Sequence, residues 1–194
     1  MSINSNQIIC ALDFDDFSKA ENFIKAIDYD IVYKIGMEFF YRFGIEGIRK
    51  ISKEKKKIKL FLDLKLHDIP NTVERAIHPL VSNVKPYMLT IHIAGGRKML
   101  QNAVSVVNEV SKNSNVQRPI LLGVTILTSL NNKDLQEMGH TISITEVVKN
   151  LSNIEETIIF KDKIGRIRDI QIHPVTGKLY FLADNKLWVM KKKK

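Results

Sequence analysis

The sequence lacks the features of a secreted or membrane-inserted protein. One cysteine, Cys10, occurs among 194 residues, so no disulfide can form within the chain, as is typical of a reducing cytoplasm. The first residues lack the basic start and long apolar core of a signal peptide. No run of about 18 apolar residues is present, and we therefore expect a cytoplasmic protein with no membrane span.

Acidic residues are too few to balance the basic ones, but the excess is local. The formal net charge is +9, and residues 161–194 contain ten Lys or Arg against three Asp or Glu. The preceding 160 residues carry 20 basic and 18 acidic residues, a balance of +2. A basic end such as residues 191–194 is usually solvated, so we do not expect nucleic acid as a partner. The composition shift instead indicates a boundary.

Apolar residues make up 44% of the chain, enough to form a core. Short apolar runs alternate with segments of helical period over the first 155 residues or so. The expected strands are 7–12, 31–35, 58–64, 88–93 and 120–127. The expected helices are 16–27, 39–55, 72–84, 97–112 and 144–151, the last starting with a capping box at Ser143 and Glu146. Five such units predict an α/β fold with a parallel sheet, in either a doubly wound sheet or a (β/α)₈ barrel.

The last forty residues follow a different pattern. Residues 158–160, 168–172, 179–182 and 187–190 are expected to form short strands separated by turn signals. This pattern predicts a short antiparallel β-meander, too small to hold a core alone. We therefore divide the chain into residues 1–153 and a hairpin segment with a basic tail at 154–194.

Three alternating charges stand where the third strand should end, in the run from Asp63 to Thr72. Side chains two apart on a strand project to the same face, so Asp63 and Lys65 should lie side by side. Asp68 follows, in the connection where Ile69-Pro70 stops the strand. Charges crowded at a strand end indicate a site, although a solvated end with incidental salt bridges is the alternative.

Polar side chains mark the carboxyl ends of all five expected strands, the edge where α/β enzymes build their sites. We expect His92 to be a hydrogen-bonded structural histidine rather than a base. These polar residues are Asp13, Lys34, Asp63, Lys65, His92, Thr125 and Thr128.

Several of these stretches together resemble the orotidine 5′-monophosphate decarboxylase family, over roughly residues 6–152. The resemblance is carried by Ala11-Leu12-Asp13, Tyr33-Lys34-Ile35-Gly36, the run Phe61 to Thr72, Ile91-His92-Ile93-Ala94-Gly95-Gly96 and Val124 to Ser129. It implies a (β/α)₈ barrel, a homodimer, orotidine 5′-monophosphate as substrate, and a decarboxylation that needs no cofactor or metal.

The resemblance also implies roles for single residues. Lys34, Asp63, Lys65 and Asp68 match the family's charged tetrad, in which Lys65 protonates C6 of the pyrimidine and Asp68 enters the site of the dimer partner. Asp63 would lie near the substrate carboxylate. The remaining substrate contacts would come from Asp13 and Lys34 to the ribose, and from Ile69, Thr72 and Thr128.

The later part of the chain departs from the family pattern. Thr-Pro-Gly-Ile-Arg-like and Gly-Arg-Pro-like loops do not occur, so the barrel is expected to be truncated after about five units. Residues 165–190 instead resemble the last propeller blade of soluble quinoprotein sugar dehydrogenases. Loss of the phosphate-binding loops would depress turnover and affinity. The alternatives are an inert truncated or fused remnant, or a related magnesium-dependent sugar-phosphate decarboxylase.

Overall fold

Five β-α units form the main body of the protein in a computed structural model, which describes residues 8–55, 57–158, 167–172, 179–183 and 186–189. Its strands are β1 (Ile9–Ala11), β2 (Val32–Gly36), β3 (Lys59–Leu66), β4 (Met88–His92) and β5 (Ile120–Val124). The intervening and following helices are α1 (Phe17–Ala26), α2 (Met37–Ser52), α3 (Pro70–Pro79), α4 (Gly96–Asn113), α5 (Asn132–Glu137) and α6 (Ile144–Ile158).

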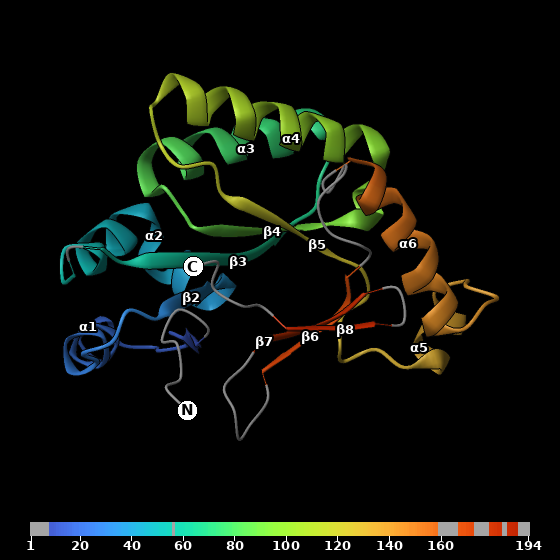
Figure 1. Cartoon of the computed structure of the whole chain (residues 1–194), viewed down its shortest axis with the longest axis horizontal. Coiled ribbons are helices and arrows are strands. Elements are labelled where there is room, and N and C mark those ends of the chain that lie inside the picture. The colour runs from blue at the N-terminus through green and yellow to red at the C-terminus, as the bar shows by residue number, and fades with distance from the viewer. Residues whose placement is uncertain (1–7, 56, 159–166, 173–178, 184–185, 190–194) are drawn as a thin grey trace.

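The five strands are parallel and lie in the order β1-β2-β3-β4-β5 (Figure 1). Each successive strand is added at the same edge of the growing sheet, as in a (β/α) barrel. A doubly wound sheet would reverse direction at a switch point. The predicted parallel α/β architecture is confirmed, and the strand order favours its barrel form.

Strand β3 shows how the sheet buries one face. Leu60, Leu62 and Leu64 are buried in the core, while Phe61 and Asp63 between them are half-buried. This two-residue alternation places the leucines against the helices and Asp63 on the other face. Figure 1 shows α3 and α4 side by side along the sheet, and the Asn102 amide on α4 donates to the Glu74 carboxylate on α3 at 2.7 Å.

Two helices are shaped by residues that interrupt them. Gly44 has φ +61°, a conformation that glycine adopts at little cost, and it divides α2. Pro79 has no N–H to donate and ends α3, so residues Leu80–Val84 continue as a wide π-helical turn. The predicted single helix over residues 72–84 is therefore two segments.

The predicted capping box of α6 is confirmed, since Glu146 N–H donates to Ser143 Oγ and Ser143 N–H donates to Glu146 Oε2. Helix α6 runs to Ile158, so a strand starting at that residue was wrong, and residues 159–160 lie outside the described residues. The division at residue 153 stays a prediction. In the part of the chain that the structure describes, no helix is long and apolar enough to cross a membrane.

Three antiparallel strands follow, β6 (Ile167–Ile172), β7 (Leu179–Ala183) and β8 (Lys186–Val189), in the order β6-β7-β8. They correspond to three of the predicted meander strands. The lysines at 191–194 lie outside the described residues.

Candidate active site at the carboxyl edge of the sheet

Four charged side chains from three neighbouring strands meet at the carboxyl edge of the sheet. Lys34 Nζ on β2 lies 3.4 Å from Asp13 Oδ1, just beyond β1, and 3.8 Å from Asp63 Oδ2 on β3. Lys65 Nζ lies 2.9 Å from Asp63 Oδ1. The result is a row of alternating charge, Asp13, Lys34, Asp63 and Lys65, which confirms that Asp63 and Lys65 lie side by side.

Burial increases toward the centre of this row. The Asp63 side chain is 16% exposed and is shared by both lysines, whereas the Asp13 side chain is 55% exposed. Partial removal from water strengthens each charge's effect on its neighbours. The two ammonium groups therefore hold Asp63 between them, and the Asp13 carboxylate at the end of the row is the most exposed of the four side chains.

Gly36 is a neighbour whose small size keeps the row together. A Cβ at this position would lie 3.2 Å from Asp13 Oδ1 and 3.6 Å from Lys34 Nζ. The first separation is tighter than most Cβ contacts, so a side chain here would push Asp13 away from Lys34. Gly36 lies in one of the stretches that resemble the family, but no role was predicted for it.

Lys65 reaches the site from an unusual backbone conformation, with φ +49°. The pairing of β3 with β4 is irregular between Leu62 and Leu66, so Lys65 lies on a bulge. Thr90 on β4 faces this bulge and accepts a hydrogen bond from Lys65 N–H at 2.8 Å. Thr90 was missed from the sequence, although a hydroxyl in a strand expected to be buried must find a partner.

The other predicted site residues do not join this row. Asp68 and Ile69 are exposed in the connection after β3, and Thr72 is exposed in the first turn of α3. The Asp68 carboxylate accepts from Ile69 N–H at 2.7 Å, and none of the ion pairs among the described residues joins it to Lys65. Thr128 is exposed in a turn after β5.

Two histidines flank the site at the ends of β3 and β4. The centroids of the His67 and His92 rings lie 5.0 Å apart. Among the described residues, the His92 side chain makes this ring contact and does not form the predicted hydrogen bond. Burial lowers the pKa of His92, and the nearby His67 and Lys65 lower it further. The neutral imidazole is therefore favoured beside Lys65.

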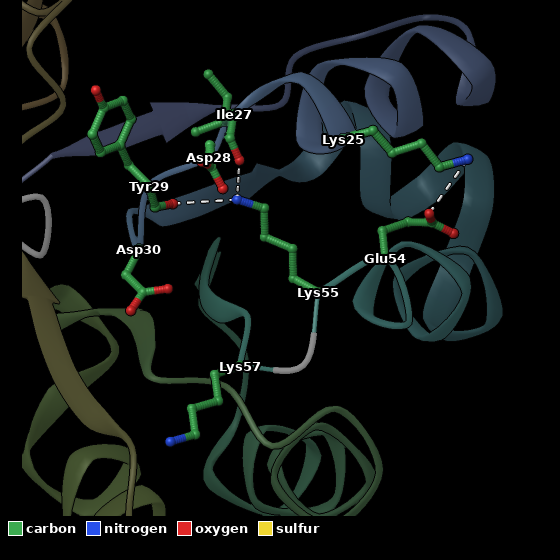
Figure 2. Close-up of a pocket in the computed structure, with 8 residues that line it drawn as sticks. All are labelled: Lys25, Ile27, Asp28, Tyr29, Asp30, Glu54, Lys55 and Lys57. Atoms are coloured by element: carbon green, nitrogen blue, oxygen red, sulfur yellow. Dashed lines mark hydrogen bonds and ion pairs between the residues drawn. The ribbon is translucent and has the colours of Figure 1, made fainter.

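A pocket of about 540 Å³ lies at the opposite, amino end of β2 and β3 (Figure 2). The Lys55 ammonium donates to the carbonyls of Ile27 and Tyr29, and Lys25 pairs with Glu54 at 3.3 Å. These groups bind protein atoms and tie the loop before β2 to the end of α2. In barrels this end serves stability, so we assign the pocket a structural role.

The sequence model of the orotidine 5′-phosphate decarboxylase / HUMPS family matches residues 6–166. The orotidine 5′-phosphate decarboxylase of Carboxydothermus hydrogenoformans is 42% identical over 153 residues, covering 76% of this chain and 60% of the relative. That of Vibrio cholerae is 32% identical over 178 residues, covering 84% and 74%. The chain thus spans about three fifths of the length of the first of these relatives.

Solved structures agree with these sequence matches. The crystal structure of orotidine 5′-phosphate decarboxylase from Lactobacillus acidophilus superposes with a TM-score of 0.70 at 31% identity, covering 78% of this chain and 67% of that one. An uncharacterized conserved protein from Geobacillus kaustophilus gives a TM-score of 0.70 at 32% identity, covering 77% and 68%.

Proposed function

Because the chain belongs to the orotidine 5′-phosphate decarboxylase / HUMPS family, we propose that it converts orotidine 5′-monophosphate to uridine 5′-monophosphate and carbon dioxide. The observation that carries this proposal is the row of four charged side chains at the carboxyl edge, Asp13, Lys34, Asp63 and Lys65. Its ammonium nitrogens lie 2.9 to 3.8 Å from the neighbouring carboxylate oxygens. These residues lie within the stretches that resemble the family.

Lys65 is the proposed proton donor. Breaking the bond between C6 and the carboxylate carbon leaves the electron pair on C6, in an orbital outside the ring π-system. An ammonium group beside C6 stabilises this charge and then transfers its proton to the same carbon. The neutral amine regains a proton from solvent. Lys65 is suited to this role because its ammonium is held by the Asp63 carboxylate, 2.9 Å away.

Asp63 has a second proposed role, toward the substrate. Its carboxylate would face the carboxylate of the bound nucleotide, and like charges repel. Loss of carbon dioxide removes this repulsion, so it disfavours the ground state more than the transition state. Asp13 and Lys34 would bind the ribose hydroxyls, and the 55% exposure of the Asp13 side chain leaves its carboxylate accessible.

The proposed assembly is a homodimer in which Asp68 and Thr72 reach the partner's site, while Ile69 lines the substrate site. All three are exposed in this chain, and the Ile69 side chain is 65% exposed despite being apolar. Thr128, exposed after β5, is the remaining proposed substrate contact.

The proposed location of the protein is the cytoplasm. The single cysteine, Cys10, fits this location because no disulfide can form within the chain.

The direct test follows the ring absorbance of orotidine 5′-monophosphate with the purified chain and with Lys65→Ala. We expect Lys65→Ala to lower turnover at least about 1,000-fold, because proton donor and ammonium charge are lost together. Lys57→Ala is a matched control, since Lys57 lies at the amino-end pocket (Figure 2).

Substrate loss that is equal in Lys65→Ala and in the unaltered chain would contradict the proposal, as would no loss in either. Magnesium-dependent release of carbon dioxide from a sugar-phosphate acid would point to the related decarboxylase instead.

A further inference from the structure

Thr90 is a buried hydroxyl residue placed opposite the bulge that carries Lys65. It lies in the middle of β4 and is 5% exposed, between the fully buried Leu89 and Ile91. On β3, Leu62 pairs with Leu89 and Leu66 pairs with Ile91. Four steps along β3 therefore match two steps along β4, and the residues between them cannot form regular ladder hydrogen bonds.

The Thr90 hydroxyl replaces the missing ladder bonds. It accepts from Lys65 N–H at 2.8 Å, and its own hydrogen can go to Asp63 Oδ1 at 3.2 Å or to the Leu62 carbonyl at 3.4 Å. A hydroxyl has one hydrogen, so it serves one of these acceptors at a time. Thr90 thus contacts both members of the Asp63–Lys65 ion pair.

These contacts close a ring around the proposed proton donor. The Lys65 main chain is held by Thr90, the Lys65 ammonium is held by Asp63 Oδ1, and the same Asp63 oxygen can accept from Thr90. Lys65 is fixed at both ends, although its φ of +49° is unfavourable for a lysine. Without the hydroxyl, a half-buried N–H would lose its partner and the bulge could relax.

We propose that Thr90 is the positioning residue of this site, which holds Lys65 on its bulge and Asp63 beside it in the geometry needed for proton transfer to C6. The inference rests on the proposed function, because it assigns to Lys65 the delivery of a proton. Thr90 itself need not touch the substrate. Its effect should fall on turnover rather than on binding, since a small misplacement of a reacting group can cost about 100-fold in rate.

The experiment compares Thr90→Val, which keeps the branched shape and removes the hydroxyl, with Thr90→Ser, which keeps the hydroxyl. We expect Thr90→Val to lower kcat about 100-fold and to leave KM within about threefold. In Thr90→Val, hydrogen exchange of the Lys65 amide should be at least about tenfold faster. Thr90→Ser should restore both quantities to within about fivefold of the unaltered chain.

Ser111→Ala is the matched control, because the Ser111 hydroxyl is buried on α4 and has no hydrogen-bond partner among the described residues. It should change neither kcat nor the exchange of the Lys65 amide. Equal effects of Thr90→Val and Ser111→Ala would overturn the proposal, as would Thr90→Ser behaving like Thr90→Val.

Two further outcomes are distinguishable. Thr90→Ala provides a second hydroxyl-free variant if the valine variant does not fold. If the unaltered chain shows no Lys65-dependent decarboxylation, the proposed function fails, while Lys65 amide exchange still decides whether Thr90 holds the bulge. Unchanged exchange in the folded hydroxyl-free variants would overturn the Thr90 proposal whatever the activity.

Discussion

Lys65, the proposed proton donor, has a backbone conformation that a lysine rarely adopts. Its φ of +49° lies in the left-handed region, where Cβ crowds the following carbonyl. Strain of this kind persists where surrounding contacts enforce it, here the Thr90 hydroxyl and the Asp63 carboxylate. The backbone conformation that places the Lys65 ammonium in the proposed site therefore lowers the free energy of unfolding.

This strain predicts an inverted order of stability for two substitutions that both remove the ammonium. Lys65→Gly should have a free energy of unfolding about 1 kcal/mol higher than Lys65→Ala, because glycine adopts positive φ without steric cost. Urea denaturation of the two variants measures the difference.

The matched pair is Lys57→Gly and Lys57→Ala, because Lys57 is not among the described residues of positive φ. There, alanine should be the more stable variant, since glycine loses more backbone entropy on folding. A Lys65→Gly variant less stable than Lys65→Ala would contradict the proposed strain.

Among the elements, β3 and β4 are joined at their carboxyl ends by the His67 and His92 rings, 5.0 Å apart. The lowered pKa of His92 makes the native protein bind a proton there less readily than the unfolded chain does. As pH falls below the ordinary histidine value of about 6.5, the unfolded state gains protons first. The free energy of unfolding should therefore fall as pH decreases from about 7 to about 5.

Replacing the ring isolates this contribution. His92→Gln should show a smaller drop in urea midpoint between about pH 7 and about pH 5 than the unaltered chain does. His78→Gln, at an exposed position on α3, is the control and should keep the full drop. An unaltered chain whose midpoint rises on acidification, or a His92→Gln variant with the same drop, would disprove the assignment.

The element pattern explains what the sequence could predict about the site. Lys34, Asp63 and Lys65 were expected at one edge because each lies at or near the end of an expected buried strand, and parallel strands bring their carboxyl ends together. That expectation needed no detailed side-chain geometry. Asp13 was expected at the same edge, and the structure shows it in an ion pair with Lys34 at 3.4 Å.

The bulge at Lys65 could not be predicted in the same way. A regular strand was expected to end at residue 64, whereas β3 continues to Leu66. The irregularity arises from pairing with β4 and from the Thr90 hydroxyl, 25 residues later in the chain. The hydrophobic periodicity of one segment carries no information about its neighbours, so it does not predict a bulge that depends on pairing with another strand.

Helix α5 was missed for a different reason. It has six residues, too few for a helical period to stand out, and it lies between the expected strand 120–127 and the expected helix 144–151. A local signal was present, since Asn131 and Asp134 form a capping box at its start. Capping pairs are thus more informative than periodicity for short helices.

On the scale of the whole molecule, apolar side chains are exposed beside the charged row. Met37 is 47% exposed at the start of α2, just after β2, and Ile69 is 65% exposed just after β3. Leu127, after β5, is 38% exposed. All three follow carboxyl ends of parallel strands, so they border the edge that carries the site. In the proposed homodimer, a second copy of the chain would cover this edge.

A shared site makes a prediction that a self-contained site does not. If Lys65 of one subunit works with Asp68 of the other, Lys65→Ala and Asp68→Asn should each be nearly inactive alone. In a mixed dimer, one site carries both substitutions and the other carries neither. Random mixing of equal amounts should therefore restore about a quarter of the activity of the unaltered chain.

The measurement unfolds the two variants together in urea, refolds them, and compares their activity with that of each variant refolded alone. Size-exclusion chromatography shows whether dimers have formed. Mixing Lys65→Ala with Asp63→Asn is the control, because Asp63 and Lys65 pair within one chain at 2.9 Å and no intact site can arise. No recovery with Asp68→Asn would place Asp68 in the site of its own chain. Recovery in the control would show that the regained activity does not come from a shared site. Asp68 is exposed and forms no ion pair with Lys65 among the described residues. We therefore expect activity to recover in the mixture of Lys65→Ala with Asp68→Asn, and not in the control mixture.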